Sequence, residues 1–354
     1  MSHPLRHRGR AIHLAHLQSP IFFALPLWRA ARGRAAWVAG KTSRLFGFAY
    51  TTIVIGPFAK RARACIPAFA GALACLLPCP ATCADLRVVD DTGATVTLAA
   101  PAQRIVSLAP HATELLFAAG AGNRIVGVMS DSDFPPAAKR IPIVGNVSAL
   151  DLEQILSLRP DLIVTWPYTT PAQVGLLRAQ GIAVFTTDPR TIDGIALDLE
   201  RLGSLVGRSD VADETAQRLR ARFAALAQRA AGKGLVRTFY QVSGVPLYTV
   251  GGQHLISQAL TLCGAQNVFG SLALPAPEVG VEAVLAARPE AIVAGTAGAG
   301  VPPWLDEWRR WPELPAVRAD KLFVVDANLL HRSGPRFVEG VEQLCDAIER
   351  ARAQ

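Results

Sequence analysis

The sequence lacks the motifs of several common enzyme classes. Its 354 residues contain no P-loop and no G-x-S-x-G nucleophile motif, and residues 85–354 contain no pair of histidines at metal-binding spacing. Gly295, Gly298 and Gly300 occur in the order G-x-x-G-x-G, which is not that of a dinucleotide-binding loop, and two prolines follow closely. Residues 85–354 hold only three histidines, which disfavours a histidine-rich metal site. These absences argue against an enzyme or a metal-ion chaperone.

Acidic residues are missing from the first 84 positions. This stretch holds 11 Lys and Arg and no Asp or Glu, which leaves 25 basic against 28 acidic side chains in residues 85–354. The formal net charge of +8 therefore comes entirely from residues 1–84. Because the remainder is slightly acidic, the sequence predicts no nucleic-acid partner.

Residues 60–84 have the pattern of a secretory signal peptide. Three basic side chains precede an apolar run, residues 64–77, that is too short to span a bilayer, and small residues precede Asp85. We predict cleavage before Asp85 and a soluble protein in the periplasm. Residues 1–59 fit no export signal, and we interpret them as an extension produced by a misassigned translation start. A membrane-associated N-terminus is the alternative.

Short apolar stretches alternate with helical patterns in most of residues 85–354, which predicts an α/β fold with mainly parallel sheets flanked by helices. Residues 86–99 predict a β-hairpin, and Ser148 with Asp151 predicts a capping box for a helix through Leu158. The further strands are expected at 104–108, 125–129, 161–165, 183–186, 238–242, 291–294 and 322–325, and helices at 112–119, 171–180, 254–262, 281–287 and 335–350.

Residues 191–231 contain no strand pattern. They predict two helices separated at Gly207, of which the second, from Ser209 to Ala230, would be about 33 Å long. We therefore expect an N-terminal lobe at 85–190, a helical linker at 191–231 and a C-terminal lobe at 232–354. A long backbone helix joins the two lobes in this arrangement.

An internal repeat supports two related lobes. Residues 151–164 read DLEQILSLRPDLIV, and residues 280–293 read GVEAVLAARPEAIV. The matched positions predict a helix that ends before a proline and leads into a buried strand, and chance recurrence of this common junction is the alternative. The repeat makes Glu153 and Glu282 equivalent, in the first helical turn, where the helix dipole alone would explain a carboxylate.

Aromatic and polar side chains gather in loops that are expected to follow strands. In open α/β sheets, ligands bind near the carboxyl ends of the strands. Aromatic faces with a few polar groups suit a bulky organic ligand, although each residue alone is also compatible with a structural role. By contrast, the spacing of Trp304, Trp308 and Trp311 indicates core packing. The candidate ligand-binding residues are Pro110, His111, Asp131, Trp166, Tyr168, Tyr248, His331 and Arg332.

The stretches RIVSLAPHATELLFAAGAGNRIVGV, LDLEQILSLRPDLIVTW, LCGAQNVF and RSGPR resemble the helical-backbone periplasmic binding proteins of ABC importers. That family carries cobalamin, ferric siderophores or haem. The resemblance spans about residues 86–350 and implies an iron- or B12-binding domain at about 103–354. It implies a monomer that captures a ligand non-covalently between two lobes and delivers it to a membrane permease, with no catalytic residue, metal or resident cofactor.

Within this family, the cobalamin-binding members are the most similar. They have cysteines in the contexts C-G-x-x-N-x-F and L-C-x-A, which implies a disulfide between Cys263 and Cys345. An even pair of cysteines in an oxidising compartment also favours a disulfide, with two free buried thiols as the alternative. The resemblance further implies that Glu153 and Glu282, one on each lobe, dock to arginines of the permease.

The ligand is less closely defined by the resemblance. Trp166 and Arg332 match the cobalamin binders, whereas Asp131, Val147 and Ala276 stand where those proteins have aromatic residues. We predict cobalamin or a related corrinoid as the ligand. Haem or a ferric siderophore is the alternative, with Tyr168 or His331 as a ligand to haem iron. An enzyme or a metal-ion chaperone using the same cleft is a more distant alternative.

Overall fold

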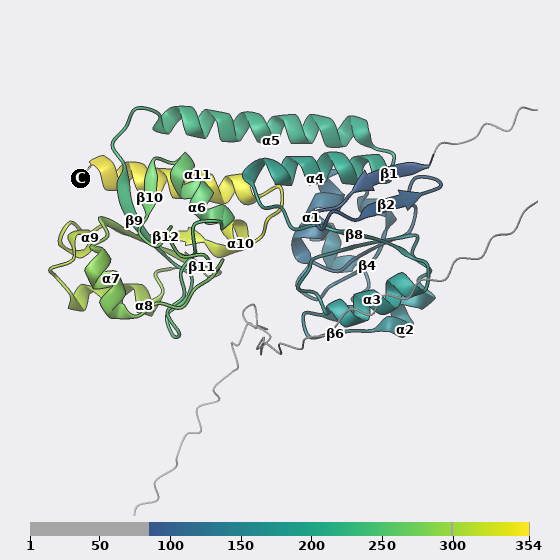
Figure 1. The fold of residues 1–354 in the computed structure, drawn as a ribbon, viewed down its shortest axis with the longest axis horizontal. Coiled ribbons are helices and arrows are strands. Elements are labelled where there is room, and N and C mark those ends of the chain that lie inside the picture. The colour runs from purple at the N-terminus through teal and green to yellow at the C-terminus, as the bar shows by residue number, and fades with distance from the viewer. Residues whose placement is uncertain (1–84, 299, 354) are drawn as a thin grey trace, which may run out of the picture. The chain divides into compact units, whose positions relative to one another are not determined.

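The computed structural model describes residues 85–298 and 300–353, so the predicted extension 1–59 and signal peptide 60–84 lie outside the described residues. The described part has two lobes with parallel sheets flanked by helices, which confirms the predicted fold class (Figure 1). Within this part, no helix is both long and apolar enough to cross a membrane.

The N-terminal lobe is built on a four-stranded parallel sheet in the order β4-β3-β7-β8. All four residues of β7 are buried, as expected for a strand covered on both faces. The predicted β1–β2 hairpin forms at the start of the lobe. The elements are β1 (Leu86–Val89), β2 (Thr95–Leu98), β3 (Ile105–Ser107), α1 (Pro110–Ala118), β4 (Ile125–Val128), β5 (Gly145–Asn146), β6 (Ala149–Leu150), α2 (Leu152–Ser157), β7 (Leu162–Thr165), α3 (Pro171–Ala179) and β8 (Ala183–Thr186).

The C-terminal lobe has a parallel sheet in the order β10-β9-β11-β12. In both lobes the spatial order is therefore second, first, third and fourth strand, as an internal duplication predicts. Trp308 is buried in this lobe and packs against Phe239, in agreement with the core role expected for the tryptophans. The elements are β9 (Val236–Gln241), α6 (Leu255–Leu262), β10 (Ala265–Asn267), α7 (Val281–Ala287), β11 (Ala291–Thr296), α8 (Pro303–Asp306), α9 (Pro315–Arg318), β12 (Leu322–Asp326), α10 (Ala327–Leu330) and α11 (Phe337–Ala353).

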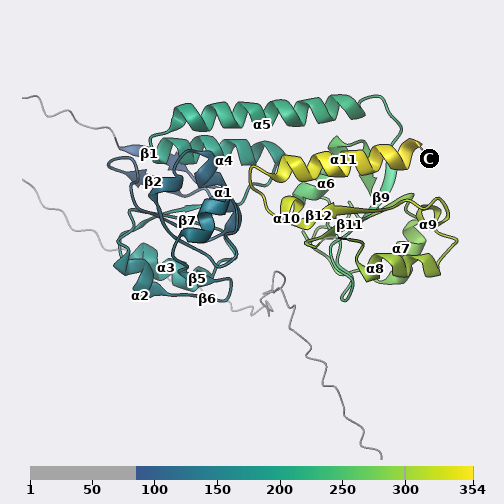
Figure 2. The ribbon, with the colours of Figure 1, turned by 180° about the vertical axis from the view of Figure 1, so that it is seen from behind.

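Two helices connect the sheets. Helix α4 (Ile192–Leu205) starts where the Thr191 hydroxyl accepts the Gly194 N–H, and Gly207 with φ of 63° ends the segment between the two helices. Helix α5 (Ser209–Ala230) then runs for 22 residues, with the bounds expected from the sequence. Besides α4, it packs against α1 of the N-terminal lobe and α11 of the C-terminal lobe, so it contacts elements on either side of the linker (Figure 2).

The repeated unit of the N-terminal lobe is closed by reciprocal hydrogen bonds. The chain leaves α2 through Arg159, whose φ of 46° lies in the left-handed region. The Asp161 carboxylate accepts the Arg104 N–H at 3.0 Å, directly before β3. In return, the Arg104 Nε donates to the Leu158 carbonyl at 2.7 Å and so satisfies a carbonyl at the end of α2.

The C-terminal lobe repeats this arrangement. Arg288 ends α7 with φ of 45°, and the Glu290 carboxylate accepts the Arg237 N–H at 2.9 Å. The Arg237 guanidinium donates to the Ala287 carbonyl at 2.6 Å. The sequence repeat therefore encodes a shared helix-to-strand junction, including the conformation of the arginine that precedes each proline.

The predicted capping box at Ser148 and Asp151 is wrong. Asp151 is itself the N-cap of α2, and its side chain accepts the Gln154 N–H at 2.9 Å. Ser148 instead lies in the turn between β5 and β6, where its N–H donates to the Asn146 side chain at 2.9 Å. Ser148 is therefore part of an Asx turn and does not cap α2.

A disulfide joins Cys263 and Cys345, and it confirms the predicted pairing. Cys263 directly follows α6, and Cys345 lies in α11. The bond therefore ties two helices of the C-terminal lobe across 82 positions of sequence.

Candidate ligand site

Three of the predicted ligand-binding side chains lie together in the N-terminal lobe. Pro110 opens α1, so His111 is in its first turn, and Trp166 directly follows β7. The Trp166 ring lies 5.8 Å from that of His111 and 4.7 Å from that of Tyr168, both in edge-to-face contact. Tyr168 is 53% exposed and Trp166 is half-buried, so this aromatic group is accessible at one side.

His111 is held neutral with one ring nitrogen as an acceptor. Burial lowers its pKa to about 4, and the charge of Arg332 acts in the same direction, whereas a hydrogen bond to the backbone of Thr187 opposes them. Its buried Nε2 has no hydrogen-bond partner among the described residues, so the bond to Thr187 uses Nδ1–H. In this tautomer the Nε2 lone pair is an acceptor inside the lobe.

Arg332 belongs to a cluster of ions between the two lobes. Its guanidinium donates to Asp133 at 2.5 Å and lies 3.4 Å from Glu114. Arg336 donates to Glu114 at 2.6 Å and stacks on the Phe134 ring at 3.9 Å from its centroid. The structure therefore gives Arg332 two protein carboxylates as partners, and its contact with a ligand stays a prediction.

The electrostatics of this cluster favour ionised carboxylates. Burial alone would raise the pKa of Asp133, but the hydrogen bond and charge of Arg332, with the charge of Arg336, lower it overall. Glu114 is only 3% exposed and is paired with both arginines. Gly334 lies between these arginines, and a Cβ there would stand 3.2 Å from Glu114 Oε2. The glycine of the RSGPR motif thus permits a close approach to α1.

Two predicted residues of the C-terminal lobe, His331 and Tyr248, lie beside the end of β9 and make a second group. The Tyr240 hydroxyl and His331 Nε2 share a hydrogen bond of 3.0 Å, and Tyr240 is fully buried. Burial, together with the charge of His254, lowers the pKa of His331 to about 4. Tyr248 is half-buried and pairs with Ser243 and Glu278 in isolated β-bridges.

Asp131 stands apart from both groups. It is exposed in the turn after β4 and takes no part in the ring contacts and ion pairs described above. The two groups themselves are linked through Arg332, which neighbours His331 in the chain and whose charge reaches His111.

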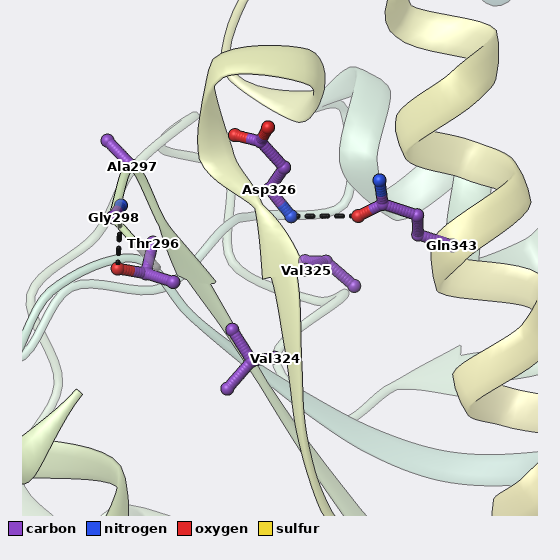
Figure 3. A pocket seen from close by; sticks show the side chains of 7 residues that line it. All are labelled: Thr296, Ala297, Gly298, Val324, Val325, Asp326 and Gln343. Carbon is purple, nitrogen blue, oxygen red and sulfur yellow. Dashed lines mark hydrogen bonds between the residues drawn. The ribbon is translucent and has the colours of Figure 1, made fainter. Parts of the chain in front are cut away.

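A shallow hollow of about 420 Å³ opens at the carboxyl ends of β11 and β12 (Figure 3). In it, the Asp326 N–H donates to Gln343 Oε1 at 3.0 Å, and the Asp326 carboxylate caps α10. None of the predicted ligand-binding residues lines the hollow, and we assign no ligand to it. Its lining consists of Thr296, Ala297, Gly298, Val324, Val325, Asp326 and Gln343.

Four further side chains near the candidate site were missed by the sequence analysis. Glu114, Asp133, Phe134 and Arg336 all lie in or beside motifs with family resemblance, yet only contacts between distant segments reveal their pairing. The two arginines of RSGPR were a usable signal, because buried arginines require carboxylate partners. In residues 85–298 and 300–353, no cluster of three His, Cys, Asp or Glu side chains could hold a metal ion.

Comparison with known proteins agrees with this architecture. A family model described as periplasmic binding protein matches residues 105–329. A vitamin B12-binding protein of Vibrio cholerae is 36% identical over 256 residues, which are 72% of this chain and 92% of that protein. The crystal structure of the periplasmic vitamin B12 binding protein of Vibrio cholerae superposes with a TM-score of 0.65 at 36% identity, covering 72% of this chain and 99% of that one.

A structure of a periplasmic heme-binding protein from Roseiflexus sp. RS-1 is similar at a lower level. Its TM-score is 0.59 at 26% identity, with 71% of this chain and 99% of that chain covered. Proteins whose names differ in ligand therefore share the two-lobed fold described above. The matched family model extends from β3 in the N-terminal lobe to α10 in the C-terminal lobe. The chain belongs to the periplasmic binding protein family.

Proposed function

We propose that this protein captures cobalamin or a related corrinoid in the periplasm and delivers it to the permease of an ABC importer. The observation that carries the proposal is the 36% identity to a vitamin B12-binding protein along 92% of that protein's length. The protein binds and releases its ligand unchanged, so it is neither an enzyme nor a metal-ion chaperone, and it needs no cofactor of its own.

The chemistry of the aromatic group suits this ligand. A corrinoid offers a broad ring for contact with Trp166 and peripheral amides that both donate and accept hydrogen bonds. The neutral His111 packs edge to face against the Trp166 ring, with 5.8 Å between the ring centroids, and so supports that contact. Arg332 has donors for an amide carbonyl in addition to those that engage Asp133 and Glu114.

A titration with cyanocobalamin, hydroxocobalamin and a cobalamin precursor tests the proposal directly. We expect tight binding of at least one corrinoid, and Trp166→Ala should weaken it by about 1–3 kcal/mol, as expected for the loss of an aromatic anchor. Wild-type affinity in the double variant Trp166→Ala, Arg332→Ala would remove both residues from the site. Binding of haem or a ferric siderophore in preference to every corrinoid would replace the proposed ligand.

We propose that Glu153 and Glu282 dock the protein to arginines of the permease. Both side chains are exposed, and each lies in the first turn of its helix, on different lobes. The Glu153→Arg, Glu282→Arg double variant should abolish uptake of the ligand while the purified protein still binds it, because charge reversal repels an arginine. Normal uptake at equal protein levels would leave helix-dipole stabilisation as their only role.

A further inference from the structure

The turn of the β1–β2 hairpin holds residues 186–188, which are the last residue of β8 and the two residues after it. The Thr186 N–H donates to the Asp90 carboxylate at 3.1 Å, and the Asp91 N–H donates to the Thr186 carbonyl at 3.1 Å. The Asp188 N–H then donates to the Asp91 carboxylate at 2.6 Å. Two successive acids of the hairpin thus fix the backbone on either side of Thr187.

Helix α4 secures the same segment from its other side. The Thr187 hydroxyl donates to the fully buried Asp198 carboxylate at 2.6 Å. Arg201 donates to Asp198 at 3.2 Å and to Asp91 at 2.7 Å, so one guanidinium ties the helix to the hairpin turn. The segment is therefore fixed by a network of hydrogen bonds in which both anchoring elements take part.

The rings of His111 and Trp166 both depend on this segment. The side chain of Trp166, whose only polar group is the indole N–H, forms a hydrogen bond with the Asp188 carboxylate, and His111 bonds to the backbone of Thr187. Burial raises the pKa of Asp188, while the charge of Arg190 and the bond from Trp166 oppose the rise. Asp188 also forms an ion pair with Arg190. The hairpin thus holds the backbone of Asp188, Arg190 pairs with its carboxylate, and the carboxylate presents an acceptor to the indole.

We propose that Asp188 is a positioning residue for ligand binding. It fixes the Trp166 indole against His111, and the β1–β2 hairpin and α4 hold the segment that contains Asp188. This inference rests on the proposed function, because it gives Asp188 a role through a residue that contacts the ligand. An indole with a fixed orientation loses less conformational entropy when the ligand binds, so preorganisation contributes to affinity.

A double-mutant cycle tests this role with cyanocobalamin as the ligand. Asp188→Ala should weaken binding about tenfold, as expected when a hydrogen bond to a charged group is lost. In a Trp166→Phe background, which has no indole N–H, the same substitution should have no further effect. Asp188→Asn retains an acceptor oxygen and should restore most of the affinity. Asp346→Ala, in α11 of the C-terminal lobe, removes an exposed ion pair with Arg229 of α5 and serves as the control with unchanged affinity.

Fluorine NMR of protein labelled with 5-fluorotryptophan provides a readout that needs no ligand. The Trp166 signal, assigned by its absence in Trp166→Phe, should shift or broaden in Asp188→Ala and stay at its wild-type position in Asp346→Ala. An unchanged signal, or equal losses of affinity in both backgrounds, would overturn the inference. Failure of the wild-type protein to bind any corrinoid would instead count against the proposed function, and the fluorine signal would decide the role of Asp188 on its own.

Discussion

The two lobes share a backbone plan but distribute aromatic volume differently. Trp166 in the N-terminal lobe corresponds in the repeat to Gly295, which lies 129 positions later. A Cβ on Gly295 would stand 2.4 Å from the Tyr240 hydroxyl and 2.8 Å from His331 Nε2. Strand pairing places Tyr240 beside Val293 and Ser107 beside Val164, so Tyr240 corresponds to the small Ser107. The large ring therefore stands after the third strand, β7, in the N-terminal lobe and on the first strand, β9, in the C-terminal lobe.

This exchange explains why the candidate site is asymmetric. Tyr240 is fully buried and bonded to His331, whereas Trp166 is half-buried and in contact with the exposed Tyr168. The duplicated scaffold therefore provides two equivalent strand ends, of which only one presents its ring for contact. A repeat in sequence predicts equal backbones, but side-chain volume decides which lobe offers the aromatic surface.

Of the differences between the two lobes, the disulfide is the one whose removal should change stability most. Only the C-terminal lobe has one, and it closes a loop of 82 positions. Cys263→Ser with Cys345→Ser should lower the free energy of unfolding by about 4–5 kcal/mol on the chain-entropy model. Denaturant unfolding with and without reductant measures this loss, and a wild-type midpoint in the reduced protein would contradict it.

Protonation of the buried histidines should lower the free energy of unfolding at acidic pH. Burial lowers the pKa of His111, His254 and His331 to about 4. In this pH range the histidines bind protons in the unfolded chain but not in the folded one. Stability should therefore fall as the pH drops from about 6.5 to about 4. His254 contributes up to roughly 3 kcal/mol of this fall, and His254→Asn, which retains a helix cap, should reduce it.

Asp198 makes the opposite contribution to stability, over a pH range that overlaps that of the histidines. Burial raises the pKa of Asp198 to about 8, with a further rise from the charge of Asp91, although Thr187 and Arg201 oppose it. Stability should therefore decline as the pH rises from about 4 to about 8, because the unfolded chain has already released this proton. Asp198→Asn should flatten that decline in a series of denaturant melts, and an unaltered pH profile would contradict the assignment.

Gly295→Ala tests the exchange of ring positions directly. The new methyl group would overlap Tyr240 and His331, which should cost about 1–3 kcal/mol of unfolding free energy, as for an overpacked core. Gly298→Ala is the matched control, because a Cβ there meets nothing within 4 Å. Equal stability of the two variants, measured by thermal melting, would show that the C-terminal lobe has room for a larger residue at this position.

The smallest predicted effect concerns what the lobes have in common. Arg104→Ala and Arg237→Ala each remove a hydrogen bond to the last turn of a helix, and both arginines are exposed. Each should cost about 1 kcal/mol, the usual net contribution of a hydrogen bond. Similar losses in calorimetry would support equivalent junctions, while a large loss in one lobe alone would show that the two have diverged energetically. Arg87→Ala, which removes an exposed ion pair, is the control.

Local patterns predicted the elements well, and contacts between distant segments account for what they missed. The bounds of α5 and α7 followed from Gly207, from periodicity and from the proline after each repeat. The pairing of Arg336 with Glu114 spans 222 positions, and no local pattern contains it. The wrong prediction at Ser148 has a similar cause on a shorter scale. The Asn146 side chain accepts the Ser148 N–H and forms a turn, which the capping-box pattern does not take into account.

The β1–β2 hairpin also has a consequence for the order in which the chain folds. Its Asp91 meets Asp188 across 97 positions and Arg201 across 110. Contacts of such long sequence separation must pay the entropy of closing large loops before they stabilise anything, which slows folding. The hairpin turn emerges early in synthesis, yet its partners on α4 follow about a hundred residues later. The N-terminal lobe therefore cannot complete its hydrogen-bond network until α4 has formed, and we expect the segment that holds Trp166 to become rigid late in the folding of that lobe.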